Sequence, residues 1–220
     1  MISKNILLKS LSLLALPALF ASCGSTGIPT PNPKQVKPIK AVHVNPYKAG
    51  TYEYFTASSS YPKTHKTFKN TEVLKATKAE DVKILVDLDM QRAFLLSSGK
   101  VAIDYPVSTG NKKFPTPPGE YQILRMIEKD KRSNLYGKIY DAEGSLVKSN
   151  ADSTKDTIPE GGKFEGALMA NWMRITWSGI GMHRGYVPRY PASHGCIRTP
   201  SSIVKTVYSK VKVGTPVTIR

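Results

Sequence analysis

Residues 181–198 carry two short motifs, Gly181-Met182-His183-Arg184-Gly185 and, eight residues further on, Ser193-His194-Gly195-Cys196-Ile197-Arg198. Together they place one thiol, two imidazoles and several turn-forming glycines within a short span. A thiol attacks well only as the thiolate, so a nucleophilic cysteine needs a base or a cation beside it. Either His183 or His194 can serve Cys196 in that way.

The glycine before the cysteine bears on how such a site would stabilise negative charge. Gly195 permits close backbone approach, so consecutive amide N–H groups of this loop can point at one developing oxyanion. We expect a helix to begin near Thr199, and the positive end of its dipole would favour the thiolate of Cys196. These parts predict chemistry of the acyl-transfer class.

A zinc site is the alternative, because cysteine and histidine are both zinc ligands. His183, His194 and Cys196 lack the paired spacing of ordinary zinc sites, and no clear fourth ligand stands near them in the sequence. We therefore expect no metal.

Residues 81–220 consist of short alternating or β-branched runs separated by turns, which is typical of a mainly β domain. We expect strands at 82–88, 92–96, 101–108, 120–127, 138–140, 145–148, 171–177 and 217–220. One or two short helices complete the domain, the clearer one beginning with Thr199 as N-cap and Pro200 at the first helical position. Its expected buried face consists of Ile203, Val204, Val207 and Val211.

The first 23 residues read as a lipoprotein signal peptide. Lys4 and Lys9 precede an apolar run that is too short to span a membrane stably, and small residues follow it. Phe20-Ala21-Ser22-Cys23 resembles a bacterial lipobox, which implies that Cys23 is lipidated. We thus expect a lipid-anchored protein on the periplasmic face of the cell envelope. In a bacterium with two membranes, Gly24 after the cysteine resembles the lipoprotein sorting signal that permits transfer to the outer membrane.

Lipidation of Cys23 would leave Cys196 as an unpaired thiol in an exported protein, where structural cysteines normally pair. A Cys23–Cys196 disulfide and a small buried hydrophobe at position 196 are the competing interpretations. The polar, turn-like residues around Cys196 favour the nucleophile.

Residues 24–80 read as a tether. The part up to about Lys48 is rich in proline, threonine and lysine, which favours extended backbone. Residues 50–80 contain several aromatic side chains, which can pack against the domain or lie in a longer linker. His43 and His65 are expected to be surface residues.

The chain is basic, with 32 Lys and Arg against 16 Asp and Glu and a formal net charge of +16. The excess is spread along the sequence. Outside the cytoplasm such a protein meets anionic lipids and wall polymers, and no nucleic-acid-binding motif with interleaved aromatics is present.

The two motifs resemble the signature of the L,D-transpeptidase catalytic domain, the YkuD family. Upstream and downstream pieces agree with this resemblance: Val107-Ser108-Thr109-Gly110, Thr116-Pro117-Pro118-Gly119-Glu120-Tyr121 and Gly214-Thr215-Pro216-Val217. It covers residues 81–220 and implies a β-sandwich of the L,D-transpeptidase type.

The resemblance also implies roles for single residues. Cys196 would be the acylated nucleophile and His183 its base, oriented by the carbonyl of Arg184 or a neighbour. The amides of His194, Gly195 and Cys196 would form the oxyanion hole, with the His194 side chain structural or facing the substrate. Four residues are expected to contact the substrate: Ser193, Tyr186, Tyr190 and Arg198, the last of which can instead brace the loop through an ion pair.

The implied reaction needs no cofactor. The thiolate attacks the peptide bond between the third residue of a peptidoglycan stem peptide and the following D-Ala, and an amine then resolves the acyl-enzyme. The acceptor can be another stem, giving a 3→3 crosslink, a lipoprotein lysine or a D-amino acid. A carboxypeptidase or wall-peptide hydrolase on the same scaffold and a noncatalytic peptidoglycan-binding lipoprotein are the alternatives.

Overall fold

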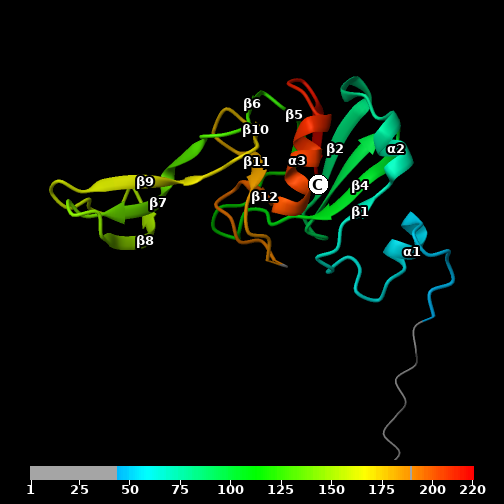
Figure 1. Ribbon diagram of the computed structural model, residues 1–220, viewed down its shortest axis with the longest axis horizontal. Helices are drawn as coiled ribbons and strands as arrows, with labels where there is room; N and C mark the ends of the chain where they lie inside the picture. The colour runs from blue at the N-terminus through cyan, green and yellow to red at the C-terminus, as the bar shows by residue number, and fades with distance from the viewer. Residues whose placement is uncertain (1–43, 189) are drawn as a thin grey trace, which may run out of the picture. The chain divides into compact units, whose positions relative to one another are not determined.

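The computed structural model describes residues 44–188 and 190–220 (Figure 1). The predicted signal peptide, Cys23, the first part of the tether and His43 lie outside the described residues. Within them, no helix has both the length and the apolar character needed to cross a membrane.

The described residues are mainly β, as predicted. The helices are α1 (Tyr52–Thr56), α2 (Thr71–Ala76) and α3 (Ser201–Lys210), with a short 3₁₀ turn at Ala79–Asp81. The strands are β1 (Phe68–Lys69), β2 (Val82–Asp87), β3 (Arg92–Ser97), β4 (Lys100–Pro106), β5 (Gly119–Gln122), β6 (Arg125–Ile127), β7 (Arg132–Tyr140), β8 (Leu146–Asp152), β9 (Lys163–Leu168), β10 (Trp172–Arg174), β11 (Gly181–Arg184), β12 (Ile197–Thr199) and β13 (Pro216–Ile219).

Among the described residues these strands form three sheets. The largest has the order β1-β4-β3-β2-β13-β5, the second β12-β11-β10-β6 and the third β8-β7-β9. Most neighbours in the first sheet are antiparallel, but β13 runs parallel to β2, and β11 runs parallel to β12 in the second. The third sheet extends away from the other two (Figure 1).

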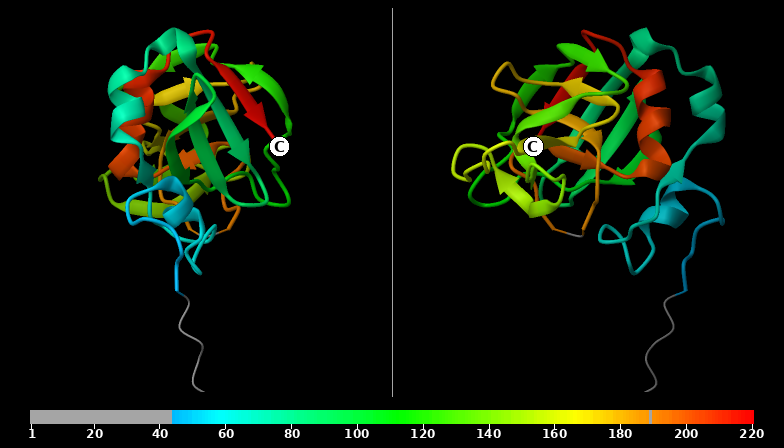
Figure 2. Two further views of the ribbon diagram at one scale, coloured as in Figure 1. Left: turned by 90° about the vertical axis from the view of Figure 1, so that its right-hand side faces the viewer. Right: turned by 60° about the vertical axis from the view of Figure 1, so that its left-hand side comes forward.

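One apolar core joins the first two sheets and α3. Strand β2 alternates as a half-buried strand should, with Val82, Ile84 and Val86 turned into the core. Of the predicted buried face of α3, Ile203, Val204 and Val207 are buried within the helix, and Val211 is buried as the residue that follows it. Helix α3 also lies beside α2 in Figure 2, and Lys210 Nζ donates to Leu74 O at 2.9 Å. In residues 81–220 the first two sheets pack together with the ten-residue helix α3, which agrees with the predicted sandwich.

Two predicted elements are displaced. Helix α3 begins at Ser201 with Pro200 as N-cap, one residue later than expected, because Thr199 is buried as the last residue of β12. The single strand expected at 120–127 is two strands, since the chain leaves one sheet and enters another at Ile123. The Ile123 amide donates to Thr215 O and the next amide to Arg174 O.

Residues 50–80 pack on the domain, which is one of the two alternatives that the sequence left open for this part of the chain. Part of the segment surrounds a buried ion pair between Arg92 of β3 and Asp104 of β4, whose side chains are fully inaccessible to solvent. Tyr52 and Tyr61 each donate a hydroxyl hydrogen bond to Asp104 Oδ2 at 3.0 Å. The Arg92 guanidinium also lies over the rings of Phe55 and Tyr61.

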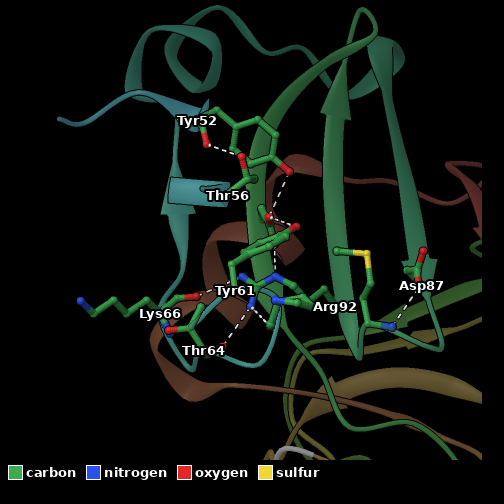
Figure 3. A network of polar contacts seen from close by, with 10 residues as sticks. Tyr52, Thr56, Tyr61, Thr64, Lys66, Asp87 and Arg92 are labelled. Atoms are coloured by element: carbon green, nitrogen blue, oxygen red, sulfur yellow. Dashed lines mark hydrogen bonds and ion pairs between the residues drawn. The ribbon is translucent and has the colours of Figure 1, made fainter. Parts of the chain in front are cut away.

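Further N–H groups of the Arg92 guanidinium donate to backbone carbonyls of the same segment. It donates to the carbonyls of Pro62, Thr64 and Lys66 at 3.0–3.2 Å (Figure 3). Burial raises the pKa of Asp104, opposed by the Arg92 charge and the hydrogen bonds that it accepts. A buried charge is tolerated only when it is paired and hydrogen-bonded, and residues 52–66 complete that pairing.

Candidate active site

His183 and Cys196 are brought together by a parallel strand pair. Strands β11 and β12 run side by side with Met182 opposite Ile197 and His183 opposite Arg198, so Cys196 stands at the entrance of β12, beside β11. Both side chains line a cavity of about 620 Å³. His183 and Cys196 are thirteen positions apart in the sequence, and the pairing of β11 with β12 brings them to the same cavity.

The imidazole of His183 is held by its own backbone neighbour. Nδ1 lies 2.8 Å from the carbonyl oxygen of Arg184, which agrees with the orienting role predicted for that carbonyl. Because a carbonyl can only accept, we assign the hydrogen to Nδ1, which leaves a lone pair on Nε2. Burial lowers the pKa of His183 to about 4, so the ring is neutral at pH 7 and can accept a proton.

The Cys196 thiol rests in its protonated form. Burial raises the pKa of the thiol, opposed by the Gly181 amide and by the positive charges of Arg198 and Lys131. The Sγ atom donates to the carbonyl oxygen of Gly179 at 3.8 Å, a contact that only the protonated thiol makes. A neutral thiol beside a neutral imidazole requires proton transfer during attack, as in general-base catalysis.

The loop before the nucleophile is folded around the Ser193 hydroxyl. This hydroxyl donates to the Cys196 carbonyl and accepts from the Gly195 amide at 3.1 Å. The Gly195 amide is therefore already used, which leaves the amides of His194 and Cys196 from the predicted oxyanion set. Ser193 is only 2% exposed, so its hydroxyl shapes the loop, and the predicted contact with substrate stays a prediction.

The hydroxyl of Thr116 holds the same loop as the Ser193 hydroxyl, and sequence reasoning did not assign Thr116 a role. Thr116 Oγ1 donates to Gly195 O and accepts from the Gly110 amide, both at 2.8 Å. Thr116 belongs to the Thr-Pro turn motif, which was the signal for its importance. Gly195 itself has φ +101°, a conformation that favours glycine.

Gln91 forms a further layer behind this loop. It has φ +51°, and its side-chain amide binds both Thr109 Oγ1 and the Thr109 amide at 2.7 and 3.0 Å. The Thr109 carbonyl in turn accepts the amides of Ala192 and Ser193 at 3.0 Å each. No sequence motif pointed to Gln91, because its role depends on a contact across eighteen residues.

His194 also lines the cavity, where its ring is held in an aromatic stack. Its ring stacks on Tyr136 of β7 with centroids 3.7 Å apart and an interplanar angle of 17°, and Phe114 lies at 4.9 Å. The stack gives the His194 side chain a structural contact, while the predicted alternatives, a structural and a substrate-facing role, both stay predictions. The contact joins the third sheet to the nucleophile loop.

Arg198 lines the cavity with a half-buried guanidinium whose pKa is lowered by burial. Among the described residues, none of the ion pairs involves Arg198. Its side chain packs over Gly185, where a Cβ atom would lie 3.0 Å from Arg198 Cγ. The described residues therefore do not contain the loop-bracing ion pair that was considered for Arg198. The positive charge of the Arg198 guanidinium is not paired with a carboxylate among them.

The two tyrosines that are expected to contact the substrate are both exposed, Tyr186 at 79% and Tyr190 at 62%. Tyr186 lines the cavity, as does exposed Arg184, whereas the lining does not include Tyr190. The backbone carbonyl of Tyr190 accepts a hydrogen bond from Ser108 at 3.0 Å.

Trp172 forms a buried part of the cavity wall that sequence reasoning missed. Its ring centroid lies 6.0 Å from that of His183, and its Nε1 has no hydrogen-bond partner in the described structure.

Within residues 44–188 and 190–220, no group of three or more His, Cys, Asp and Glu side chains is arranged to hold a metal ion.

A family model for the L,D-transpeptidase catalytic domain, YkuD, matches residues 81–219. Similar solved structures include an L,D-transpeptidase from Mycobacterium smegmatis, at 22% identity and TM-score 0.48, covering 64% of this chain and 58% of that one. An Enterococcus faecium L,D-transpeptidase with a cysteine-to-serine mutation has 28% identity and TM-score 0.43, covering 64% and 50%. One from Stackebrandtia nassauensis has 19% identity and TM-score 0.47, covering 76% and 63%.

The chain thus spans less than two thirds of the length of these solved chains. The comparison with curated proteins gave no match.

Proposed function

This chain belongs to the L,D-transpeptidase catalytic domain family, and from that premise we propose that it is a cysteine-dependent peptidoglycan transpeptidase with Cys196 as its nucleophile. The observation that carries the proposal is the convergence of Cys196 and a neutral His183 on one cavity. The family acts on peptidoglycan stem peptides, so the donor substrate is a stem in which D-Ala follows the third residue.

Acylation begins when Sγ of Cys196 attacks the carbonyl carbon of the third stem residue. Nε2 of His183 takes the thiol proton, and the amides of His194 and Cys196 stabilise the oxyanion. The carbon–nitrogen bond to D-Ala then breaks. D-Ala leaves as a neutral amine after His183 returns the proton to its nitrogen, and a thioester remains on Cys196.

Deacylation reverses these roles. An amine of the acceptor attacks the thioester carbon while His183 takes a proton from it. The carbon–sulfur bond breaks, a new amide bond forms, and the proton passes to the departing sulfur of Cys196. Water in place of the amine would give hydrolysis.

Arg198 supports the binding of an anionic donor. Its guanidinium is half buried at the cavity and belongs to none of the ion pairs of the described residues. A carboxylate of the stem peptide would gain charge-assisted hydrogen bonds there. We therefore assign Arg198 to the recognition of a substrate carboxylate.

Product analysis tests this function. Purified full-length protein incubated with disaccharide tetrapeptides should release D-Ala and form crosslinked dimers that mass spectrometry identifies as 3→3 linked. The Cys196→Ala variant should form none. Release of D-Ala with only tripeptide products would favour the hydrolase, and binding without any turnover would favour the noncatalytic lipoprotein.

We also propose that the protein is anchored in the cell envelope through lipid on Cys23. The support is the signal-peptide pattern and the lipobox-like Phe20-Ala21-Ser22-Cys23. Metabolic labelling with palmitate should mark the wild-type protein and not Cys23→Ser. An unlabelled wild-type protein would contradict the anchor without affecting the catalytic proposal.

A further inference from the structure

An exposed tryptophan stands on the rim of the catalytic cavity. Trp177 is 75% exposed and lies in the turn between β10 and β11. Arg174 holds this residue twice, with its guanidinium 5.7 Å from the ring centroid and its Nη1 donating to Trp177 O at 3.2 Å. An apolar ring kept in water by such contacts is a sign of a binding surface.

The turn that carries Trp177 is ordered by its own side chains. Thr176 Oγ1 accepts the Ile180 amide at 3.0 Å and lies 2.8 Å from Ser178 Oγ. The Gly179 amide donates to Thr176 O at 3.2 Å, and the Gly179 carbonyl is the group that accepts from the Cys196 thiol. The ring is therefore presented at a defined place, two residues from a contact of the nucleophile.

Trp177 lines two hollows, the catalytic cavity and a groove of about 480 Å³ beside β5. The other residues that line this groove are Glu120, Tyr121, Gln122, Leu124, Ile175 and Thr176. Strand β5 is the last strand of its sheet, so the groove follows a sheet edge with unpaired backbone groups.

We propose that this groove, bounded by Trp177, Gln122 and Glu120, binds the glycan strand to which the donor stem peptide is attached. The proposal rests on the proposed function, because a stem in the catalytic cavity must continue into its sugar just outside that cavity. A pyranose ring has one apolar C–H face and a polar rim of hydroxyl and acetamido groups. The indole face suits the former, and the amide of Gln122, the hydroxyl of Thr176 and the sheet edge suit the latter.

The charges of the groove also favour a neutral polymer. Glu120 lines the groove and Arg174 lies against Trp177 at its border, so charges of both signs flank the groove and neither sign is in excess. The groove mixes two aromatic residues, Trp177 and Tyr121, with the aliphatic Leu124 and Ile175 and the polar Glu120, Gln122 and Thr176, a combination that suits the apolar faces and the polar rim of a sugar chain. An acceptor peptide lying on Trp177 is the competing occupant, and it would be recognised without any sugar.

Binding of a peptide-free glycan tests the groove directly. Chitotetraose, a β-1,4-linked tetramer of N-acetylglucosamine, should bind the wild-type protein and change the fluorescence of Trp177. Calorimetry should show about tenfold weaker binding by Trp177→Ala and an intermediate effect for Trp177→Phe, which keeps an aromatic face. Tyr47→Ala is the matched control, since Tyr47 is 50% exposed and lines neither hollow.

A second measurement separates this inference from the proposed function. Relative to the wild-type protein, Trp177→Ala should lose more kcat/KM on a disaccharide tetrapeptide than on the free tetrapeptide. Equal losses on both substrates, or chitotetraose affinity that is absent or unchanged in Trp177→Ala, would overturn the glycan groove. Chitotetraose binding that depends on Trp177 in a protein without transfer activity would instead overturn the proposed function and leave the groove standing.

Discussion

Tyr136 stacks on His194 with ring centroids 3.7 Å apart, so the third sheet contacts the nucleophile loop two residues before Cys196. The two residues are 58 positions apart in the sequence. Strand β7 also supplies part of the wall of the catalytic cavity. The position of this sheet is therefore coupled to the shape of the site.

Removing this stack should loosen the sheet over the cavity. An aromatic pair contributes about 0.5–1.5 kcal/mol beyond its buried area. Tyr136→Ala should therefore raise the KM for the donor several-fold and speed hydrogen exchange of the β7 amides. Tyr136→Phe keeps the ring and should behave like the wild-type protein. Equal KM values for Tyr136→Ala and the wild type would show that the stack does not matter for donor binding.

His183 should control how acylation depends on pH. Its pKa is lowered to about 4 by burial, so the neutral base is present above that pH and is lost below it. His183→Ala should slow acylation at pH 7 by about 10²–10⁴-fold, the usual contribution of a general base. The slow rate should rise with pH, because the raised pKa of Cys196 delays ionisation of the thiol to alkaline pH. Stopped-flow kinetics measure this profile, and a flat profile in the variant would move the base role to His194.

A carbapenem should acylate the protein once, at Cys196. The strained four-membered lactam presents a carbonyl to the thiol, and the family resemblance implies that carbapenems are accepted and penicillins react poorly. Intact-protein mass spectrometry should show one adduct that is absent in Cys196→Ala and slowed in His183→Ala. An unmodified wild-type protein after long exposure would count against an activated thiol.

Thr116 should position the nucleophile loop through its hydroxyl. Thr116→Val keeps the shape and leaves the Gly195 carbonyl and the Gly110 amide without their partner, at a cost of about 1–3 kcal/mol for each buried group. The denaturation midpoint should fall, and kcat should fall more than KM changes. Thr116→Ser retains the hydroxyl and should restore both quantities. A Thr116→Val protein with lower stability but normal kcat would limit Thr116 to a purely structural role.

The parts of the molecule that depend on local sequence were predictable. The strand pattern gave β2, β3 and β4 nearly to the residue, and the two motifs pointed to His183 and Cys196. Thr199 was expected to cap α3. It is instead the last residue of β12, where it pairs with Arg184 of β11. The break at Ile123 depends on which sheet each half joins, and no local pattern reports that choice.

The supporting layer around the site could not be predicted, because it consists of contacts between distant segments. Gln91 reaches Thr109, Thr116 reaches Gly195, and Tyr136 reaches His194. Each is a common residue type in an unremarkable sequence context. Only the folded chain shows that all three support the loop that carries Cys196.

The Arg92–Asp104 pair limits how the catalytic domain can be exchanged between relatives. The family match begins at residue 81, yet the Arg92 guanidinium donates to the carbonyls of Pro62, Thr64 and Lys66, which precede it. A chimera joined at residue 81 would inherit two buried opposite charges without the polypeptide that satisfies them. The unit that keeps this ion pair satisfied therefore begins upstream of residue 81, and a transplanted domain needs residues 52–66 together with Arg92 and Asp104.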